Sequence, residues 1–176
     1  APQAYDHQLT LRVYRELLQV SPRDRELLAT LARQYELLGK PDDGLAFLVD
    51  WNQRYPGQGA LWEMQRLAWN QGADQQAAHY ARQYMDRYGP EPDMALRVSR
   101  YYWLDDQRER AYADLRNDAA RLAYNPALAR RLAIMANELG QWQPAMEHYQ
   151  SLLEQGDDTL ADLYQYISLA RYYDRD

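Results

Sequence analysis

The chain has 176 residues, of which 47% are hydrophobic and 26% charged, and a formal net charge of −6. This composition excludes a disordered chain, and the acidic charge disfavours nucleic acid as a partner because phosphate binding needs a basic surface. The sequence lacks cysteine, which excludes disulfides and cysteine-bound metals, and it lacks any run of about 18 apolar residues, so we expect no membrane span.

Hydrophobic residues recur at the helical spacing i, i+3, i+4 and i+7 along the whole chain, which predicts an all-α fold. Turn and capping residues divide this pattern into helices. In chain order, helices are expected at 6–19, 24–38, 42–54, 58–71, 74–87, 92–104, 107–122, 126–139, 142–154 and 158–173.

Several expected helix ends carry local signals. Asn125 followed by Pro126 is typical of a helix start, and Gly39, Gly72 and Gly140 suit a left-handed residue just after a helix. The other candidates for helix starts are Ser21-Pro22, Asp42, Asp74 and Asp158.

A turn block repeats four times along the chain. Its first residues are Gly39, Gly72, Asp106 and Gly140, spaced by 33, 34 and 34 positions, and each is followed five positions later by Gly or Ala. A period near 34 predicts a helix–turn–helix unit stacked on copies of itself, about five in all.

The best-preserved unit has alternating large and small residues at fixed spacings in both of its helices. These residues are Leu28, Leu31, Ala32 and Tyr35 in the first helix, and Gly44, Leu48, Trp51 and Pro56 in the second. The pattern resembles the tetratricopeptide repeat (TPR) family, although Gly44 replaces the usual Ala and Trp51 a usual small residue. The resemblance implies an all-α, right-handed superhelix of antiparallel helix pairs with about ten helices.

The repeats divide the chain into successive segments of a single solenoid spanning 1–176. Neither end has the polar capping repeat that normally closes a solenoid, so we expect a piece of a longer array. The expected segments are a second helix of a truncated repeat at 6–22, repeats at 24–57, 58–90, 91–124 and 125–157, and a first helix of a truncated repeat at 158–176.

The family resemblance implies that the first helix of each pair lines a concave surface. Arg33, Arg66 and Arg100 share one register of this surface, and Trp69 and Trp103 share another. The partner-binding strip expected there consists of Arg33, Glu36, Trp62, Arg66, Trp69, Asn70, Arg100, Trp103, Arg130, Asn137, Tyr164 and Arg171.

Two interpretations of this strip remain open. In the first, the arginines are solvated or paired with acidic neighbours such as Glu36, and the aromatic rings pack between repeats. In the second, the arginine forks bind carboxylates, and the exposed indoles stack on apolar side chains or on sugar faces.

The sequence shows no arrangement expected of an enzyme. His7, His79 and His148 fall on second helices of different repeats, so we expect no shared metal. The paired acids at 42–43, 105–106 and 157–158 lie at turns, where Asp caps helices, rather than in a glycosidase arrangement. We therefore expect no catalytic residue, no cofactor and no metal.

The TPR resemblance implies a non-enzymatic protein–protein interaction scaffold. Because Lys40 is the single lysine, the carboxylate clamp of chaperone-binding TPR domains is not expected. The tyrosine-, glutamine- and arginine-rich, lysine-poor composition also resembles the periplasmic TPR regions of outer-membrane exopolysaccharide export proteins, especially those of the Pel system.

This narrower resemblance implies a periplasmic location within an outer-membrane protein and an envelope polysaccharide-modifying enzyme as the partner. Two alternatives stay open: direct binding and guidance of the exported polysaccharide, and a cytoplasmic TPR adaptor for a peptide. The acidic composition favours a cationic polymer, whereas the arginine row favours a carboxylate-bearing partner.

Overall fold

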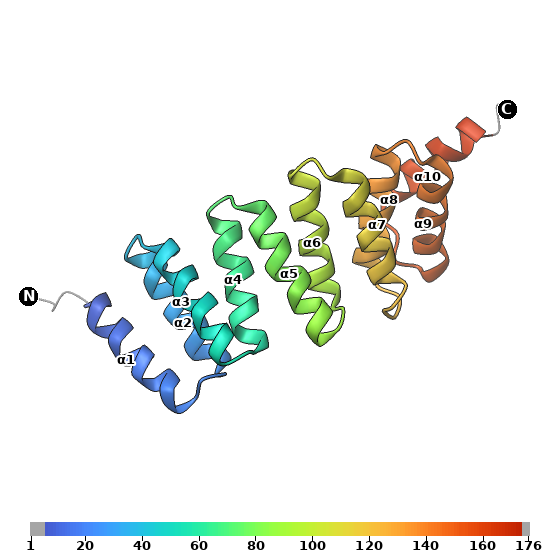
Figure 1. The fold of residues 1–176 in the computed structure, drawn as a ribbon. Helices are drawn as coiled ribbons and strands as arrows, with labels where there is room; N and C mark the ends of the chain where they lie inside the picture. The colour runs from blue at the N-terminus through green and yellow to red at the C-terminus, as the bar shows by residue number, and fades with distance from the viewer. Residues whose placement is uncertain (1–5, 174–176) are drawn as a thin grey trace, which may run out of the picture. The chain divides into compact units, whose positions relative to one another are not determined.

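The computed structural model describes residues 6–173, which form ten α-helices and no strand (Figure 1). Each helix lies within three residues of its expected position, so the all-α prediction is confirmed. The helices are α1 His7–Val20, α2 Arg25–Leu37, α3 Pro41–Arg54, α4 Gln58–Asn70, α5 Asp74–Tyr88, α6 Pro92–Leu104, α7 Arg108–Ala119, α8 Pro126–Glu138, α9 Trp142–Gln155 and α10 Leu160–Tyr173.

The chain divides into two compact units, one ending at Gly89 and the other beginning at Pro90. In the first unit, α1 packs on α2, α2 on α3 and α4, and α4 on both α3 and α5. In the second, α6 packs on α7, α8 on α7 and α9, and α9 on α10. We call α2, α4, α6, α8 and α10 the first helices, and α1, α3, α5, α7 and α9 the second helices.

Burial follows the repeat pattern within each unit. Leu28, Leu31, Ala32 and Tyr35 of α2 are all buried. The small residue at the third of these positions lets the paired helices approach, and the large residues fill the space beside it.

Gly44 of α3 shows how closely the helices approach. A Cβ atom at this position would lie 2.8 Å from the Cβ of Tyr35, closer than real side chains come. Trp51 is also buried, stacks on Phe47 with centroids 5.5 Å apart, and donates its indole N–H to the carbonyl of Pro22 at 2.8 Å. The side chain of Tyr35 therefore occupies the space that a methyl group at position 44 would need.

The turns between paired helices share one backbone conformation. Gly39, Gly72 and Gly140 have φ values of 67°, 73° and 70°, which confirms them as left-handed residues. Asp106 occupies the equivalent place between α6 and α7 with φ of 60° and is the one non-glycine residue with positive φ among residues 6–173. The turns therefore keep their geometry where the glycine is replaced.

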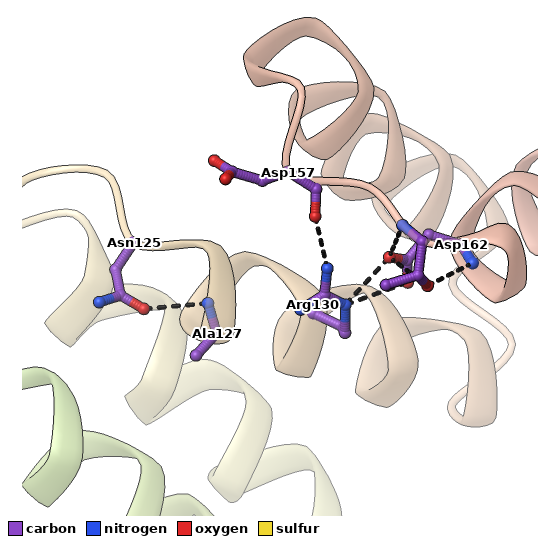
Figure 2. Close-up of polar contacts among 6 residues, drawn as sticks. Asn125, Ala127, Arg130, Asp157 and Asp162 are labelled. Carbon is purple, nitrogen blue, oxygen red and sulfur yellow. Dashed lines mark hydrogen bonds and ion pairs between the residues drawn. The ribbon is translucent and has the colours of Figure 1, made fainter.

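The helix starts agree only partly with expectation. Asn125 accepts hydrogen bonds from the backbone N–H of Ala127 and Leu128, as predicted (the first is drawn in Figure 2). The prediction for Ser21-Pro22 is wrong, because Asp24 caps α2. Two other predictions are wrong because the residues before the helices are different: Lys40 precedes α3 in place of Asp42, and Ala73 precedes α5 in place of Asp74. The prediction for Asp158 is also wrong, because Thr159 and Asp162 form a reciprocal capping box at the start of α10.

Candidate partner-binding surface

In the first unit, Glu36, Arg66 and Asn70 of the expected strip form one hydrogen-bonded group between α2 and α4. Arg66 donates from Nη1 to Glu36 Oε2 at 2.8 Å and from Nε to Glu63 Oε2 at 2.7 Å. Asn70 donates to the other oxygen of Glu36 at 2.8 Å. Arg66 thus binds carboxylates of this chain, which is the paired interpretation of the strip.

The surroundings of Arg66 favour its charged form. Burial disfavours the charged guanidinium, but the hydrogen bonds and charges of Glu63 and Glu36 outweigh burial and raise the pKa of Arg66. Glu63, which lies one turn before Arg66, is buried and was missing from the expected strip. The sequence could have predicted this contact, because an acidic residue three positions before an arginine lies beside it on a helix.

The remaining strip residues of the first unit differ in exposure. Arg33 of α2 is exposed, whereas Trp62 and Trp69 of α4 are half-buried. The ring of Trp62 meets Tyr84 of α5 edge-on, with centroids 6.1 Å apart. The two indoles therefore combine packing inside the unit with partial access to solvent.

In the second unit, Arg130 joins α8 to the start of α10 (Figure 2). Its Nε lies 3.0 and 3.2 Å from the two carboxylate oxygens of Asp162, and Nη2 donates to the carbonyl of Asp157 at 2.6 Å. Burial raises the pKa of Asp162, but hydrogen bonds from Thr159 and Arg130 outweigh burial, so the net shift is downward. Arg130 is committed to this internal contact.

Trp103 of α6 is half-buried between cationic side chains. The guanidinium carbons of Arg108 and Arg131 lie 5.3 and 5.4 Å from its ring centroid, within the range of cation–π attraction. Burial lowers the pKa of Arg131; the charge of Glu138 opposes this shift and that of Arg100 adds to it. We call Arg100, Trp103, Arg108 and Arg131 the Trp103 cluster.

Arg108 and Arg131 were absent from the expected strip. Arg108 begins the second helix of its pair, and Arg131 lies one position after the predicted Arg130. Counting by repeat period finds side chains in the same register but not lateral neighbours from adjacent helices.

Three further strip residues lie toward the end of the second unit. Asn137 donates to Gln165 of α10 at 3.4 Å. Tyr164 has 70% of its surface exposed, and Arg171 is also exposed. Beyond the strip, the ring of Trp142 of α9 packs near that of Tyr172 of α10, with centroids 6.5 Å apart.

In the described part of the chain, the histidines and acids show no grouping suited to metal chemistry. Among residues 6–173, no three His, Asp or Glu side chains come together in a way that could hold a metal ion. His7 hydrogen-bonds Gln34 at 2.8 Å, and His148 lies 3.3 Å from the Tyr112 hydroxyl. Over the same residues, no helix combines the length and apolar character needed to cross a membrane.

Comparison with known protein families finds no family that matches this chain, and comparison with curated proteins finds no matching sequence. Solved structures do match. The C-terminal part of a TPR repeat-containing protein from Cytophaga hutchinsonii superposes with a TM-score of 0.70 at 14% identity, over 97% of this chain and 67% of that chain.

Two other TPR-like structures match nearly the whole chain. YrrB, a TPR protein with an unusual peptide-binding site, gives a TM-score of 0.66 at 10% identity and covers 92% of this chain and 84% of its own. MamA gives 0.65 at 15% identity, over 86% and 90%. The chain therefore has the TPR fold, and the fold class predicted from the residue pattern is confirmed.

Proposed function

We propose that this chain is a non-enzymatic scaffold that binds another protein through exposed side chains on and beside its first helices. The observation that carries this proposal is the Trp103 cluster. Tryptophan and arginine are enriched among the residues that carry binding energy at protein interfaces. Here the guanidiniums of Arg108 and Arg131 lie within cation–π range of one half-exposed indole, and the charge of Arg100 acts on Arg131.

The internal ion pairs suggest a division of roles within the strip. Arg66 and Arg130 already bind carboxylates of this chain, so they position helices. In the second unit, the proposed docking residues are the Trp103 cluster with exposed Tyr164 and Arg171; in the first unit, exposed Arg33 offers a separate contact. YrrB has the same fold and is described as having a peptide-binding site. This likeness supports a polypeptide as the partner of this chain.

The finer proposal places this scaffold in the periplasm, within an outer-membrane exopolysaccharide export protein of the Pel type, where it recruits a polymer-modifying enzyme. Its support is the composition, with 16 tyrosines and a single lysine, which resembles such regions. An arginine-rich cluster would suit an acidic patch on that enzyme.

A second candidate function is direct binding of the exported polysaccharide. Trp142 and Tyr172 favour it, because their neighbouring rings are 40% and 61% exposed. Exposed aromatic rings provide apolar faces on which sugar rings can stack.

A pull-down from bacterial envelope extract tests both candidates. The immobilised wild type is compared with Arg100→Ala/Trp103→Ala and with Arg121→Ala/Trp142→Ala, which removes the same residue types from another surface. Far-UV circular dichroism checks that all three proteins keep their helicity.

We expect a retained protein that is lost only by Arg100→Ala/Trp103→Ala. Carbohydrate lost only by Arg121→Ala/Trp142→Ala would favour the second candidate. A protein held equally by all three chains would contradict the proposed docking surface.

A further inference from the structure

A pocket of about 430 Å³ lies between α1, α2 and α3 of the first unit. Three of its lining residues, Arg12, Arg15 and Lys40, are cationic, whereas Asp43 is the one carboxylate that lines it. This pocket is separate from the partner-binding strip. The strip lies on first helices, whereas two of the three helices that line the pocket, α1 and α3, are second helices. A net positive pocket in an acidic chain calls for a ligand of opposite charge.

The exposed side chain of Arg15 is held at the wall of this pocket. Its guanidinium donates to the Tyr35 hydroxyl and lies 5.5 and 5.4 Å from the ring centroids of Tyr35 and Phe47. A guanidinium has five N–H donors, and among residues 6–173 the Tyr35 hydroxyl is its one hydrogen-bond partner. Because the aromatic rings fix the fork, its other donors can bind an anion at little cost in side-chain entropy.

The other two cations can adjust to a ligand. Arg12 pairs with Glu16 at 3.4 Å, but both side chains are largely exposed, so this pair contributes little and can exchange. Lys40 is exposed at the turn that leads into α3. Both can therefore move toward an anion bound by Arg15.

We propose that this pocket binds a carboxylate of a partner polypeptide, with Arg15 as the fixed fork and Lys40 and Arg12 as flexible cations. The lining favours a carboxylate over a phosphate, because Asp43 repels a second negative charge. Leu11, Leu38 and Phe47 supply apolar walls for the residues next to the carboxylate. The inference rests on the proposed scaffold function, since it gives that scaffold a second contact for its partner.

Lys40 provides a site-specific probe of the pocket because it is the single lysine. Reductive methylation with carbon-13 formaldehyde labels its amine, and the terminal amine labelled by the same reaction serves as an internal reference. We expect a hexaglutamate peptide to shift the Lys40 methyl signal in a saturable way, whereas a hexalysine peptide leaves it unchanged.

Variants then identify the groups that bind. Arg15→Gln should weaken hexaglutamate binding about tenfold or more, because it removes a charge-assisted fork. Arg12→Gln should weaken it less. Arg121→Gln removes an exposed arginine elsewhere and should leave the affinity within about twofold.

The proposal is overturned if hexaglutamate leaves the Lys40 signal unmoved at millimolar concentration, or if all variants bind it equally. Inorganic phosphate displacing the peptide more effectively than acetate at equal concentration would overturn the choice of carboxylate. If Arg15→Gln loses helicity, Arg12→Gln decides: unchanged affinity in that variant also overturns the proposal. None of these results depends on Arg100 or Trp103, so failure here is distinguishable from failure of the proposed function.

Discussion

Arg66 on α4 and Glu36 on α2 link the first helices of two successive repeats, with Nη1 and Oε2 2.8 Å apart. The same guanidinium holds Glu63, whose side chain is 7% exposed. Removing the arginine would leave two carboxylates without this partner, one of them buried. The link is therefore structural.

Arg66→Ala should destabilise the first unit by about 1–3 kcal/mol, because a buried carboxylate that loses its charged partner retains its desolvation cost. Urea denaturation followed by circular dichroism measures the effect. Arg33→Ala is the matched control, since Arg33 has the same register and is exposed; it should change stability by less than about 0.5 kcal/mol. Equal effects of the two variants would contradict a structural role for Arg66.

Asp106→Gly should stabilise the second unit by about 0.5–1 kcal/mol. Asp106 has φ of 60°, where a side chain is strained and glycine is not. The reverse change, Gly140→Asp, should lower stability by a similar amount at an equivalent turn. The midpoints of urea unfolding give both values, and a loss of stability in Asp106→Gly would contradict the assigned strain.

Gly44→Ala should destabilise the first unit, although alanine is the better helix former. Propensity favours alanine by about 1 kcal/mol, but the new Cβ would lie 2.8 Å from Tyr35 Cβ, which cannot rotate away. Overpacking of this kind costs about 1–3 kcal/mol, so a net loss of about 1 kcal/mol is expected in thermal or urea denaturation. A gain would show that α2 and α3 can separate without cost.

Stability should fall with pH below about 6.5 because of His148. Burial lowers its pKa, the charge of Glu147 opposes the shift, and the charge of Arg116 adds to it. The unfolded chain therefore binds this proton more readily than the folded chain, so stability is complete above the ordinary histidine pKa of about 6.5 and is lost as pH falls toward the folded pKa.

His148→Gln should flatten this part of the pH profile, measured by urea unfolding at pH values on either side of 6.5. His79→Gln alters an exposed histidine and should leave the slope unchanged. A slope that persists in His148→Gln would assign the dependence to other groups.

The sequence predicts the helices well because their determinants are local. The large and small positions from Leu28 to Tyr35 and the glycine of each turn specify where helices pack and end. Asp106 could be placed in its turn by the repeat period, and the structure adds its left-handed backbone. Ser21 failed as a cap because Asp24, three residues later, is the residue whose side chain reaches the first free N–H groups.

The candidate surface was less predictable because it depends on contacts between helices. The period aligned Arg33, Arg66 and Arg100 in one register, but a register does not show which carboxylate lies beside each arginine. Arg131 joins the surface through Trp103, a neighbour on another helix. Such neighbours depend on helix crossing geometry, which the repeat spacing does not specify.

The contacts of Arg66 with Glu36 and of Arg130 with Asp162 also have a mechanical meaning. Each joins two first helices of successive repeats through an ion pair. Loss of such an ion pair would allow the two helices to move relative to each other. This movement would change the distance between side chains that a partner contacts at the same time. Because ionic strength weakens partly exposed charge pairs, added salt would make each unit easier to deform at concentrations too low to unfold it.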